Sequence, residues 1–277
     1  MRLHEATWLN RAAKRLAPPL SRVLCSPTLL DRVRAFDAYL NFLLGKGSGV
    51  GWDMDEEIAA ARSRIHRPDP VVFDIGANVG TWTQGLLGAI PGAKVYMFEP
   101  SAQCWPEIQK RGFATAELVR SAVGETAGKA KLHVSSEFDH SASLHTRGDS
   151  YCQDNDYREV EIDVTTVDDF MAARGIGWVD YVKMDIEGHE LFALRGARRA
   201  LEERKIGAVA FEFGTANVNS HTFFRDFWQF LTGAGFRVSR ITPGGRLLPV
   251  DQYYEDYEYF RSVSNYVAEL RDPPPRG

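Results

Sequence analysis

The sequence predicts an α/β fold in which a mainly parallel β-sheet is covered by helices on both faces. Two observations predict it. From residue 70 onward, short apolar runs alternate with segments of helical spacing, and this alternation is typical of parallel sheets. The chain of 277 residues is also 44% hydrophobic and 25% charged, which is typical of a globular protein with a full core. In such sheets, ligands bind beyond the carboxyl ends of the strands.

The strands and helices can be placed in order along the chain. Apolar runs at 71–76 and 94–100 end at a glycine and a proline, and the segments at 79–90 and 101–112 have helical spacing. These four segments form a βαβ unit. Further strands are predicted at 117–124, 178–188, 206–214, 236–242 and 262–270, and further helices at 189–205 and 223–235.

The alternation of strands and helices breaks between the third and fourth strands. Residues 129–136 and 158–170 alternate polar with apolar side chains, as antiparallel strands do, and they flank the polar segment 137–157. A polar stretch of this length inside a compact domain is usually a functional lid or a disordered link. We interpret it as a lid over the site. Its residues His140 and His145 serve as a base or as substrate contacts, or are simply solvated side chains.

The first 65 residues are expected to form a helical extension before a main domain at 66–270, whose lid insertion lies near 135–158. Basic and apolar residues are mixed in its first part: Trp8, Leu9, Arg11, Lys14, Arg15, Leu16, Leu20 and Arg22. This part has no continuous apolar core of a signal peptide and is too polar to span a bilayer. We expect a helix that packs on the main domain or on a second subunit of a homo-oligomer. The alternative is an interfacial helix that makes peripheral contact with an anionic membrane.

Charge and cysteine content narrow the functional classes. The formal net charge is −4 and the pI is about 6.0, which disfavours nucleic acid as a partner. Cys25, Cys104 and Cys152 are widely spaced and odd in number, so they indicate neither a disulfide framework nor a zinc site. A reducing, cytoplasmic location fits best.

The turn "DIGANVG" at residues 74–80 indicates a ligand that approaches the backbone closely. Gly76 and Gly80 do not complete the G-x-G-x-x-G seat of a dinucleotide, and no lysine of a phosphate loop follows. Asp74 would repel a phosphate and attract a cation. Glu99 follows the second strand, near the offset at which an acid binds ribose hydroxyls. A ribose with an amino group and no phosphate describes S-adenosylmethionine; alternatively, the glycines only form a tight turn and the acids cap helices.

Acidic residues at two later strand ends are candidates for chemistry on a hydroxyl. Asp185 follows the strand nearest the expected cofactor, and His189 has an unperturbed pKa of about 6.5, suited to a general base. Glu212 shares the same sheet edge, and with Asp185 it offers oxygen ligands for Mg²⁺. The competing interpretation is that Asp185 and Glu187 cap the next helix and that His189 lies on its surface.

A tyrosine-rich segment at 251–260 interleaves Tyr253, Tyr254, Tyr257 and Tyr259 with acidic residues. Aromatic faces beside hydrogen-bond acceptors suit a sugar, whose C–H face is apolar and whose rim is polar. They suit a dimer contact equally well. A plain packed loop is a third interpretation, and all three stay open.

Five segments taken in order resemble the FkbM-like methyltransferases: "VVFDIGANVGTWT", "VYMFEPS", "SAVGETAG", "VDYVKMDIEGHELFALRGARRAL" and "FEFG". The resemblance covers residues 68 to 240. It implies the class I methyltransferase fold, a Rossmann-like three-layer sandwich with a seven-stranded sheet, mostly parallel, whose last strand is antiparallel. It also implies the cofactor S-adenosylmethionine and an acceptor hydroxyl, often on a sugar of a glycolipid, polysaccharide or secondary metabolite.

The family's residue roles can be carried over to matching positions. Asp74, Gly76, Asn78 and Gly80 would border the methionine part and Glu99 would hold the ribose, while Ser121 and Ala122 would line the adenine. Together the residues and the resemblance predict an O-methyltransferase of a sugar or glycosylated metabolite, with Asp185, His189 and Glu212 as catalytic candidates. A nicotinamide-dependent oxidoreductase and a non-catalytic S-adenosylmethionine-binding module are the alternatives.

Overall fold

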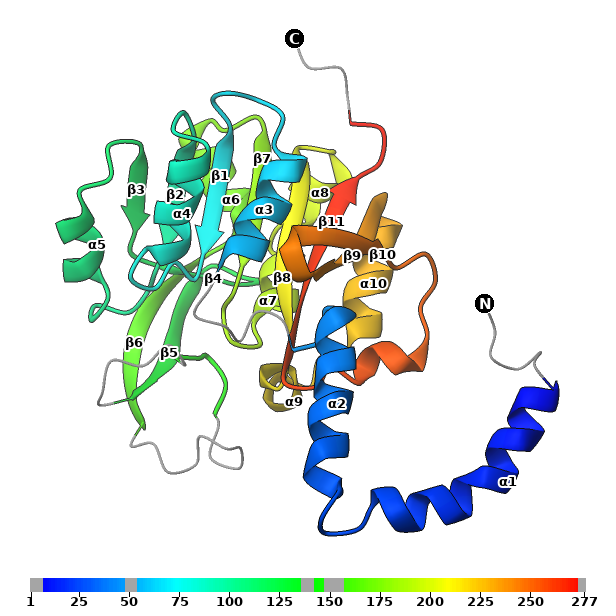
Figure 1. The fold of residues 1–277 in the computed structure, drawn as a ribbon. Helices are drawn as coiled ribbons and strands as arrows, with labels where there is room; N and C mark the ends of the chain where they lie inside the picture. Colours follow the sequence, from blue (N-terminus) through cyan, green and yellow to red (C-terminus); the bar gives the residue numbers. More distant parts are fainter. Residues whose placement is uncertain (1–6, 48–53, 136–141, 147–156, 274–277) are drawn as a thin grey trace. The chain divides into compact units, whose positions relative to one another are not determined.

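The computed structural model describes residues 7–47, 54–135, 142–146 and 157–273, and the chain divides into two compact units. The N-terminal unit, residues 1–44, contains helices α1 (Thr7–Leu24) and α2 (Leu30–Leu43). The main unit, residues 45–277, contains every other element (Figure 1). No helix within these described ranges has the length and apolarity needed to cross a membrane.

The main unit is built on an eight-stranded sheet in the order β10-β9-β11-β8-β7-β1-β2-β3. Its strands are β1 (Val71–Ile75), β2 (Lys94–Phe98), β3 (Ala116–Val119), β7 (Val179–Met184), β8 (Ile206–Gly214), β9 (Phe236–Thr242), β10 (Arg246–Pro249) and β11 (Val263–Leu270). Strands β3, β2, β1, β7 and β8 are parallel, whereas β11 is antiparallel to both β8 and β9. The predicted α/β fold with a reversed last strand is confirmed.

One edge strand was not predicted. Residues 246–249 form β10, which pairs antiparallel with β9 after the turn at Pro243–Gly245. This strand brings the sheet to eight strands where seven were predicted. Strand β10 is only four residues long, and two of these residues are an arginine and a proline. It therefore lacks the apolar run from which the other strands are predicted.

Helices cover both faces of the sheet, as predicted. One face carries α3 (Asp55–Arg64), α4 (Thr81–Ala89) and α5 (Trp105–Arg111), and the other carries α6 (Val167–Arg174), α7 (Glu190–Arg195), α8 (Arg198–Glu202) and α10 (Phe224–Gly233) (Figure 1). Side chains alternate along each strand, so Val72 packs with the first layer while Phe73 and Ile75 pack with the second. Helix α3 belongs to the main unit because Ala60 and Ala61 are fully buried in its core.

A second, three-stranded sheet follows β3. It contains β4 (Ala122–Val123), β5 (Gly128–Ser135) and β6 (Tyr157–Thr165) in the order β4-β6-β5. The antiparallel pairing of β5 with β6 confirms the predicted strand pair. Most of the predicted lid lies outside the described residues, as does His140; residues 142–146 are described, and Ser143 bridges to His133 of β5.

The predicted helix at 189–205 is two helices, and the single-helix prediction is wrong. Helix α7 ends at Arg195, and α8 begins at Arg198. The carboxylate of Asp168 accepts the N–H groups of Arg199 and Ala200 at 2.9 and 2.8 Å, which satisfies donors that a new helix start leaves free. Gly196 lies at the break, where a Cβ atom would stand 2.0 Å from the carbonyl oxygen of Gly124.

The order of the strands reverses at β1, and a ligand is expected to bind where this reversal occurs. From β1 the chain adds β2 and β3 on one side, and later adds β7 and β8 on the other side. The connections therefore leave β1 and β7 in opposite directions, and a crevice opens beyond their carboxyl ends. The turn after β1 and the residues that follow β7 stand at this position.

Candidate active site

The turn after β1 is held between the ends of β2 and β7. Gly76 has φ of +80°, and a Cβ atom there would lie 1.9 Å from the carbonyl oxygen of Asp185, so only glycine lets the turn reach β7. The N–H groups of Gly76 and Ala77 both donate to the carbonyl oxygen of Phe98, at 3.0 and 3.1 Å. The turn therefore brings its backbone to the crevice, as its two glycines predicted.

A cavity of about 600 Å³ opens beside this turn, a volume typical of small-molecule sites. Most of the predicted site residues line it: Gly76, Asn78, Glu99, Ala122, Asp185, His189 and Glu212. Apolar side chains complete much of the wall: Met54, Trp82, Phe98, Val123, Leu132, Ala142, Leu144 and Val263. Asp74, Gly80 and Ser121 are not among the lining residues.

The cavity has two ends, defined by the strands they follow. We call residues 76–79, Glu99 and Ala122 the turn end, and Asp185 with Glu212 the acidic end. Glu99 follows β2 and Glu212 lies on β8, with β1 and β7 between them. Three strand spacings separate these two carboxylate positions by about 14 Å.

Glu99 at the turn end is held by two backbone donors. Its carboxylate oxygens accept the N–H of Asn78 at 2.8 Å and the N–H of Ser101 at 2.7 Å. Burial raises the pKa of Glu99 to about 7, against the lowering effect of these two hydrogen bonds. Each oxygen keeps a lone pair for a further donor, so Glu99 can accept hydrogen bonds from a diol in the cavity.

Three of the predicted cofactor-binding residues do not line the cavity: Asp74, Gly80 and Ser121. Ser121 is buried, and its N–H donates to the carbonyl oxygen of Val119 at 2.9 Å. Gly80 has φ of +78° and stands at the N-cap of α4. Asp74 is fully buried on β1 and accepts a 2.6 Å hydrogen bond from the hydroxyl of Thr83. These residues shape the turn from within.

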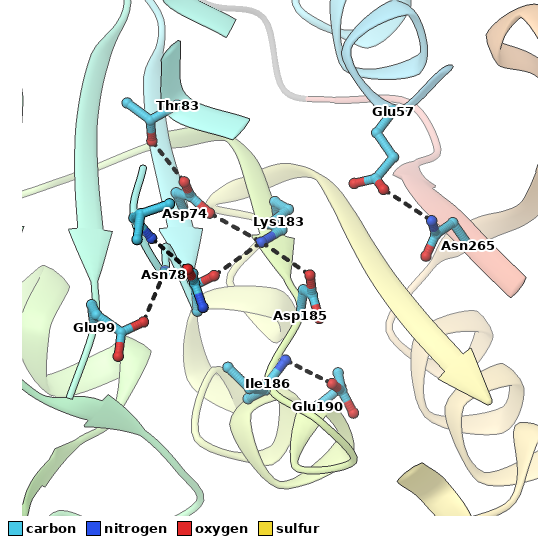
Figure 2. A network of polar contacts seen from close by, with 12 residues as sticks. Glu57, Asp74, Asn78, Thr83, Glu99, Lys183, Asp185, Ile186, Glu190 and Asn265 are labelled. Carbon is cyan, nitrogen blue, oxygen red and sulfur yellow. Dashed lines mark hydrogen bonds and ion pairs between the residues drawn. The ribbon is translucent and has the colours of Figure 1, made fainter. Parts of the chain in front are cut away.

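The cation beside Asp74 belongs to the chain itself. The Lys183 ammonium on β7 lies 3.3 Å from Asp74 and 3.5 Å from Asp185, and it donates to the carbonyl oxygen of Gly76 at 3.1 Å (Figure 2). Burial alone would lower the pKa of Lys183, but Asp74 and Asp185 more than offset it and raise the pKa. Sequence reasoning expected a ligand cation next to Asp74; parallel register instead places Lys183 directly opposite.

At the acidic end, Asp185 shares the Lys183 ammonium with Asp74, whereas Glu212 is not neutralised in this way. Glu212 lies on the same face of the sheet as Asp74 and Lys183, one strand beyond β7. Burial and the neighbouring acids Asp185 and Glu187 raise its pKa well above the ordinary value. Within the described part of the chain, Glu212 has no hydrogen-bond or ion-pair partner. Its oxygens are therefore available to a ligand.

Glu57 adds a further carboxylate behind the acidic end, and sequence reasoning missed it. It lies on α3 and accepts a 3.1 Å hydrogen bond from the side chain of Asn265 on β11, which is paired with Glu212 (Figure 2). Burial raises the pKa of Glu57 to about 7, although Lys183 lowers it. No pattern in the sequence marks this residue, because its partner is 208 residues away.

The loop that carries Asp185 is held by Glu190, a second residue that was missed. Glu190 is buried and accepts the N–H groups of Ile186 and Gly188 at 2.8 and 3.2 Å. Burial raises its pKa to about 8. The N-cap position of α7 is His189, which makes no side-chain cap hydrogen bond.

His189 is half-buried at the cavity wall and is not a simple surface residue. Its Nδ1 lies 3.1 Å from Nε2 of His145, and its ring stacks on Phe192 at 4.6 Å between centroids. Burial, followed by the neighbouring His145, lowers the pKa of His189 to about 4. The imidazole is therefore neutral at pH 7. The structure thus joins His145 of the predicted lid region to the predicted site.

Two further predictions concern a sugar contact at the tyrosine-rich segment and a Mg²⁺ site at Asp185 and Glu212. The tyrosine-rich segment 251–260 contributes no lining residue; Tyr253 and Tyr257 pack against the core, and the Tyr253 hydroxyl donates to Glu258 at 2.9 Å. Among the residues with described positions, no three His, Cys, Asp or Glu side chains converge as metal ligands would. Asp185 and Glu212 thus gain no third ligand for Mg²⁺ from the described chain.

Comparison with known proteins agrees with this arrangement. Residues 74–238 match the family model described as the methyltransferase FkbM domain. A stretch of 154 residues, 52% of this chain, is 23% identical to 2-O-methyltransferase NoeI from Sinorhizobium fredii (strain NBRC 101917 / NGR234), and it spans 63% of that protein. The chain therefore covers less than two thirds of this relative.

Solved structures give a further comparison. The methyltransferase FkbM from Methylobacillus flagellatus KT aligns with a TM-score of 0.44 at 18% identity, over 86% of this chain and 60% of that one. The precorrin-6y C5,15-methyltransferase from Geobacter metallireducens GS-15 aligns with a TM-score of 0.42 at 12% identity, over 82% of this chain and 93% of that one. The family match covers the turn, both strand-end acids of the acidic end and most of the sheet, and the chain belongs to the FkbM methyltransferase domain family.

Proposed function

We propose that this protein transfers a methyl group from S-adenosylmethionine to a hydroxyl of a saccharide or glycosylated metabolite. The observation that carries the proposal is the division of one cavity into two ends. The turn end has a fixed acceptor, Glu99, and the acidic end has Glu212, whose carboxylate has no partner among the described residues. Membership in a methyltransferase family supports the reaction type. The name of the relative NoeI, a 2-O-methyltransferase, supports an oxygen acceptor.

The residues at the turn end fit the nucleoside part of S-adenosylmethionine. Glu99 would accept hydrogen bonds from the ribose hydroxyls, and Ala122 and Val123 offer apolar contact to the adenine ring. Because Gly76 has no Cβ, the turn approaches the backbone of Asp185 closely, and residues 76–79 line the cavity. Among the described residues that line the cavity, the cation is Lys183, and Asp74 and Asp185 offset its charge, which suits a ligand that carries no phosphate.

The residues at the acidic end fit the charged part of the same molecule. Asp185 and Glu212 both line the cavity, and Glu57 lies behind them, while Lys183 is the cation among them. This excess of carboxylates favours positive charge. Bound S-adenosylmethionine supplies a methyl group on a positively charged sulfur, which is already a good electrophile.

The chain's own task is then to position and deprotonate the acceptor hydroxyl. We assign proton acceptance to a carboxylate oxygen of Glu212, because burial and neighbouring acids raise its affinity for a proton. Asp185, held by Lys183, would face the methyl-transfer centre. His189, neutral at pH 7, would hydrogen-bond the acceptor at the wall shared with His145. Apolar side chains of Leu132 and Leu144 would contact the C–H face of a sugar.

Two measurements test this function. Calorimetric titration should show binding of S-adenosylmethionine and none of NAD; the opposite order would favour an oxidoreductase. Incubation with methyl-labelled S-adenosylmethionine and a panel of saccharides should then transfer label to a hydroxyl of at least one member. Binding of the cofactor without transfer to any oxygen, nitrogen or carbon acceptor would identify a binding module instead.

A further inference from the structure

Helix α1 of the N-terminal unit presents one apolar face to solvent. The side chains of Leu16, Leu20, Val23 and Leu24 are 56%, 51%, 57% and 41% exposed. Their spacing of four, three and one residues places them on the same side of a helix. Exposed leucines are unremarkable singly, but a continuous face of them marks a surface that is covered in use.

The charges of the same helix have a single sign. Its sequence "TWLNRAAKRLAPPLSRVL" contains Arg11, Lys14, Arg15 and Arg22 and no acidic residue. Lys14, Arg15 and Arg22 are exposed and fall outside the arc of the four apolar side chains. The whole chain has a formal net charge of −4, so this concentration of positive charge is local to α1.

Comparison with helix α2 shows that the positive charge of α1 distinguishes it from another helix with exposed apolar side chains. It also exposes large apolar side chains, among them Phe36 at 62% and Tyr39 at 57%. Its charged residues, however, are mixed: Asp31, Arg32, Arg34 and Asp37. An apolar face with mixed charges has no preference for a charged partner, whereas α1 combines an apolar face with an entirely basic one.

A basic amphipathic helix of this kind suits the surface of an anionic bilayer. The apolar face can enter the boundary between headgroups and acyl chains while the basic side chains meet lipid phosphates. Helix α1 is too polar to cross the bilayer, so it would lie in the interface. A nucleic acid would match the charge but would leave the leucines exposed to water.

We propose that α1 is a membrane-surface anchor that binds anionic lipid, with Leu16, Leu20, Val23 and Leu24 inserted and Lys14, Arg15 and Arg22 paired to headgroups. This inference does not depend on the proposed reaction. It gives the N-terminal unit a role of its own, which is to hold the full chain at a bilayer.

Co-sedimentation of the full-length protein with vesicles tests the charge requirement. Vesicles of phosphatidylcholine with phosphatidylglycerol should bind the protein, and vesicles of phosphatidylcholine alone should bind it much more weakly. The variant K14E/R15E/R22E should lose at least about 100-fold in affinity, because each basic residue near an anionic surface contributes about fivefold. The charge-matched variant R62E/K110E/R237E, made at exposed sites of the main unit, should bind as the wild type does.

The apolar requirement is tested separately. The variant L16D/L20D should lose vesicle binding, whereas V218D/L248D, at positions of the main unit that are 62% and 43% exposed, should retain it. Equal loss in both charge-reversal variants would show a non-specific charge effect and overturn the proposal. A wild type that ignores anionic vesicles, but forms a dimer that L16D/L20D dissociates, would identify a second copy of the chain as the occupant.

Discussion

Glu99 and Glu212, at the two ends of the cavity, differ in how the chain satisfies their carboxylates. At the turn end, Glu99 is fixed by two backbone N–H groups, and behind the wall Asp74 is paired with Lys183 and Thr83. At the acidic end, Glu212 has no partner among the described residues and is surrounded by other acids. A charge that the chain satisfies itself can serve as a rigid support. A carboxylate without a partner in the chain can instead form its hydrogen bonds and ion pairs with a ligand.

This difference also separates positions that must be rigid from positions that must react. Hydrogen bonds to both oxygens fix the orientation of Glu99, as recognition of a diol requires. The raised pKa of Glu212 makes it a better proton acceptor than an ordinary carboxylate. The following three changes test the comparison, from the largest expected effect to the smallest.

Replacing Glu212 with glutamine should cause the largest loss. Removal of a general base lowers turnover by about 10² to 10⁴-fold, so kcat in the methyl-transfer assay should fall within that range. Because the carboxylate must be ionised to accept a proton, wild-type kcat/KM should decrease as pH falls through the raised pKa of Glu212. The variant should lack this acidic limb. The exposed Glu202→Gln serves as control, and a variant with wild-type turnover would show that Glu212 is a structural residue.

Lys183→Met should destabilise the fold by about 3 to 5 kcal/mol, because it leaves Asp74 buried without its cation. The double variant Lys183→Met/Asp74→Asn should recover much of this loss, since no uncompensated charge remains. Chemical denaturation measures both. Lys131→Met removes an exposed ion pair with Glu159 and should have a much smaller effect on stability, because solvent screens exposed pairs. Equal effects of the two lysine substitutions would contradict the account of the buried pair.

Glu190→Gln should change how stability depends on pH. The folded-state pKa of Glu190 is about 8, above its ordinary value of 4.5, so the folded protein binds more protons than the unfolded chain between these values. Stability should therefore fall as pH rises from 4.5 to 8. One pKa unit corresponds to 1.36 kcal/mol, so the difference between 4.5 and 8 amounts to about 5 kcal/mol for Glu190. The variant should show a flatter dependence in thermal unfolding; an unchanged slope would assign the effect to other groups.

The sequence predicted those parts of the fold that depend on the pattern of neighbouring residues. Strands β8 and β9 begin and end where their apolar runs do, at 206–214 and 236–242. The glycine turn was predicted because Gly76 and Gly80 need positive φ. The break between α7 and α8 was not, because it depends on Asp168 and on the approach of Gly124, both distant in sequence.

The site residues follow the same rule: local patterns predicted some of them, and those that depend on contacts across the sheet were missed. Glu99, Asp185 and Glu212 were found because strand ends share one edge of a parallel sheet. The partner of Asp74 was not found, because the register that sets Lys183 opposite it is not encoded in either strand alone. Glu57 was missed for a similar reason: only the packing of α3 on the sheet brings it to Asn265. Pairing and packing across the sheet are properties of the folded molecule.

The most direct test of the two-ended cavity is calorimetric titration of S-adenosylmethionine into three proteins: the wild type, Glu99→Gln and Glu212→Gln. Hydrogen bonds to a charged group contribute about 1.5 to 3 kcal/mol, so Glu99→Gln should weaken binding by roughly tenfold to a hundredfold. Glu212→Gln should weaken cofactor binding less than Glu99→Gln does, because Asp185 still faces the positive charge, while its turnover is lost. Cofactor binding that depends on Glu212 and not on Glu99 would contradict this division of the cavity.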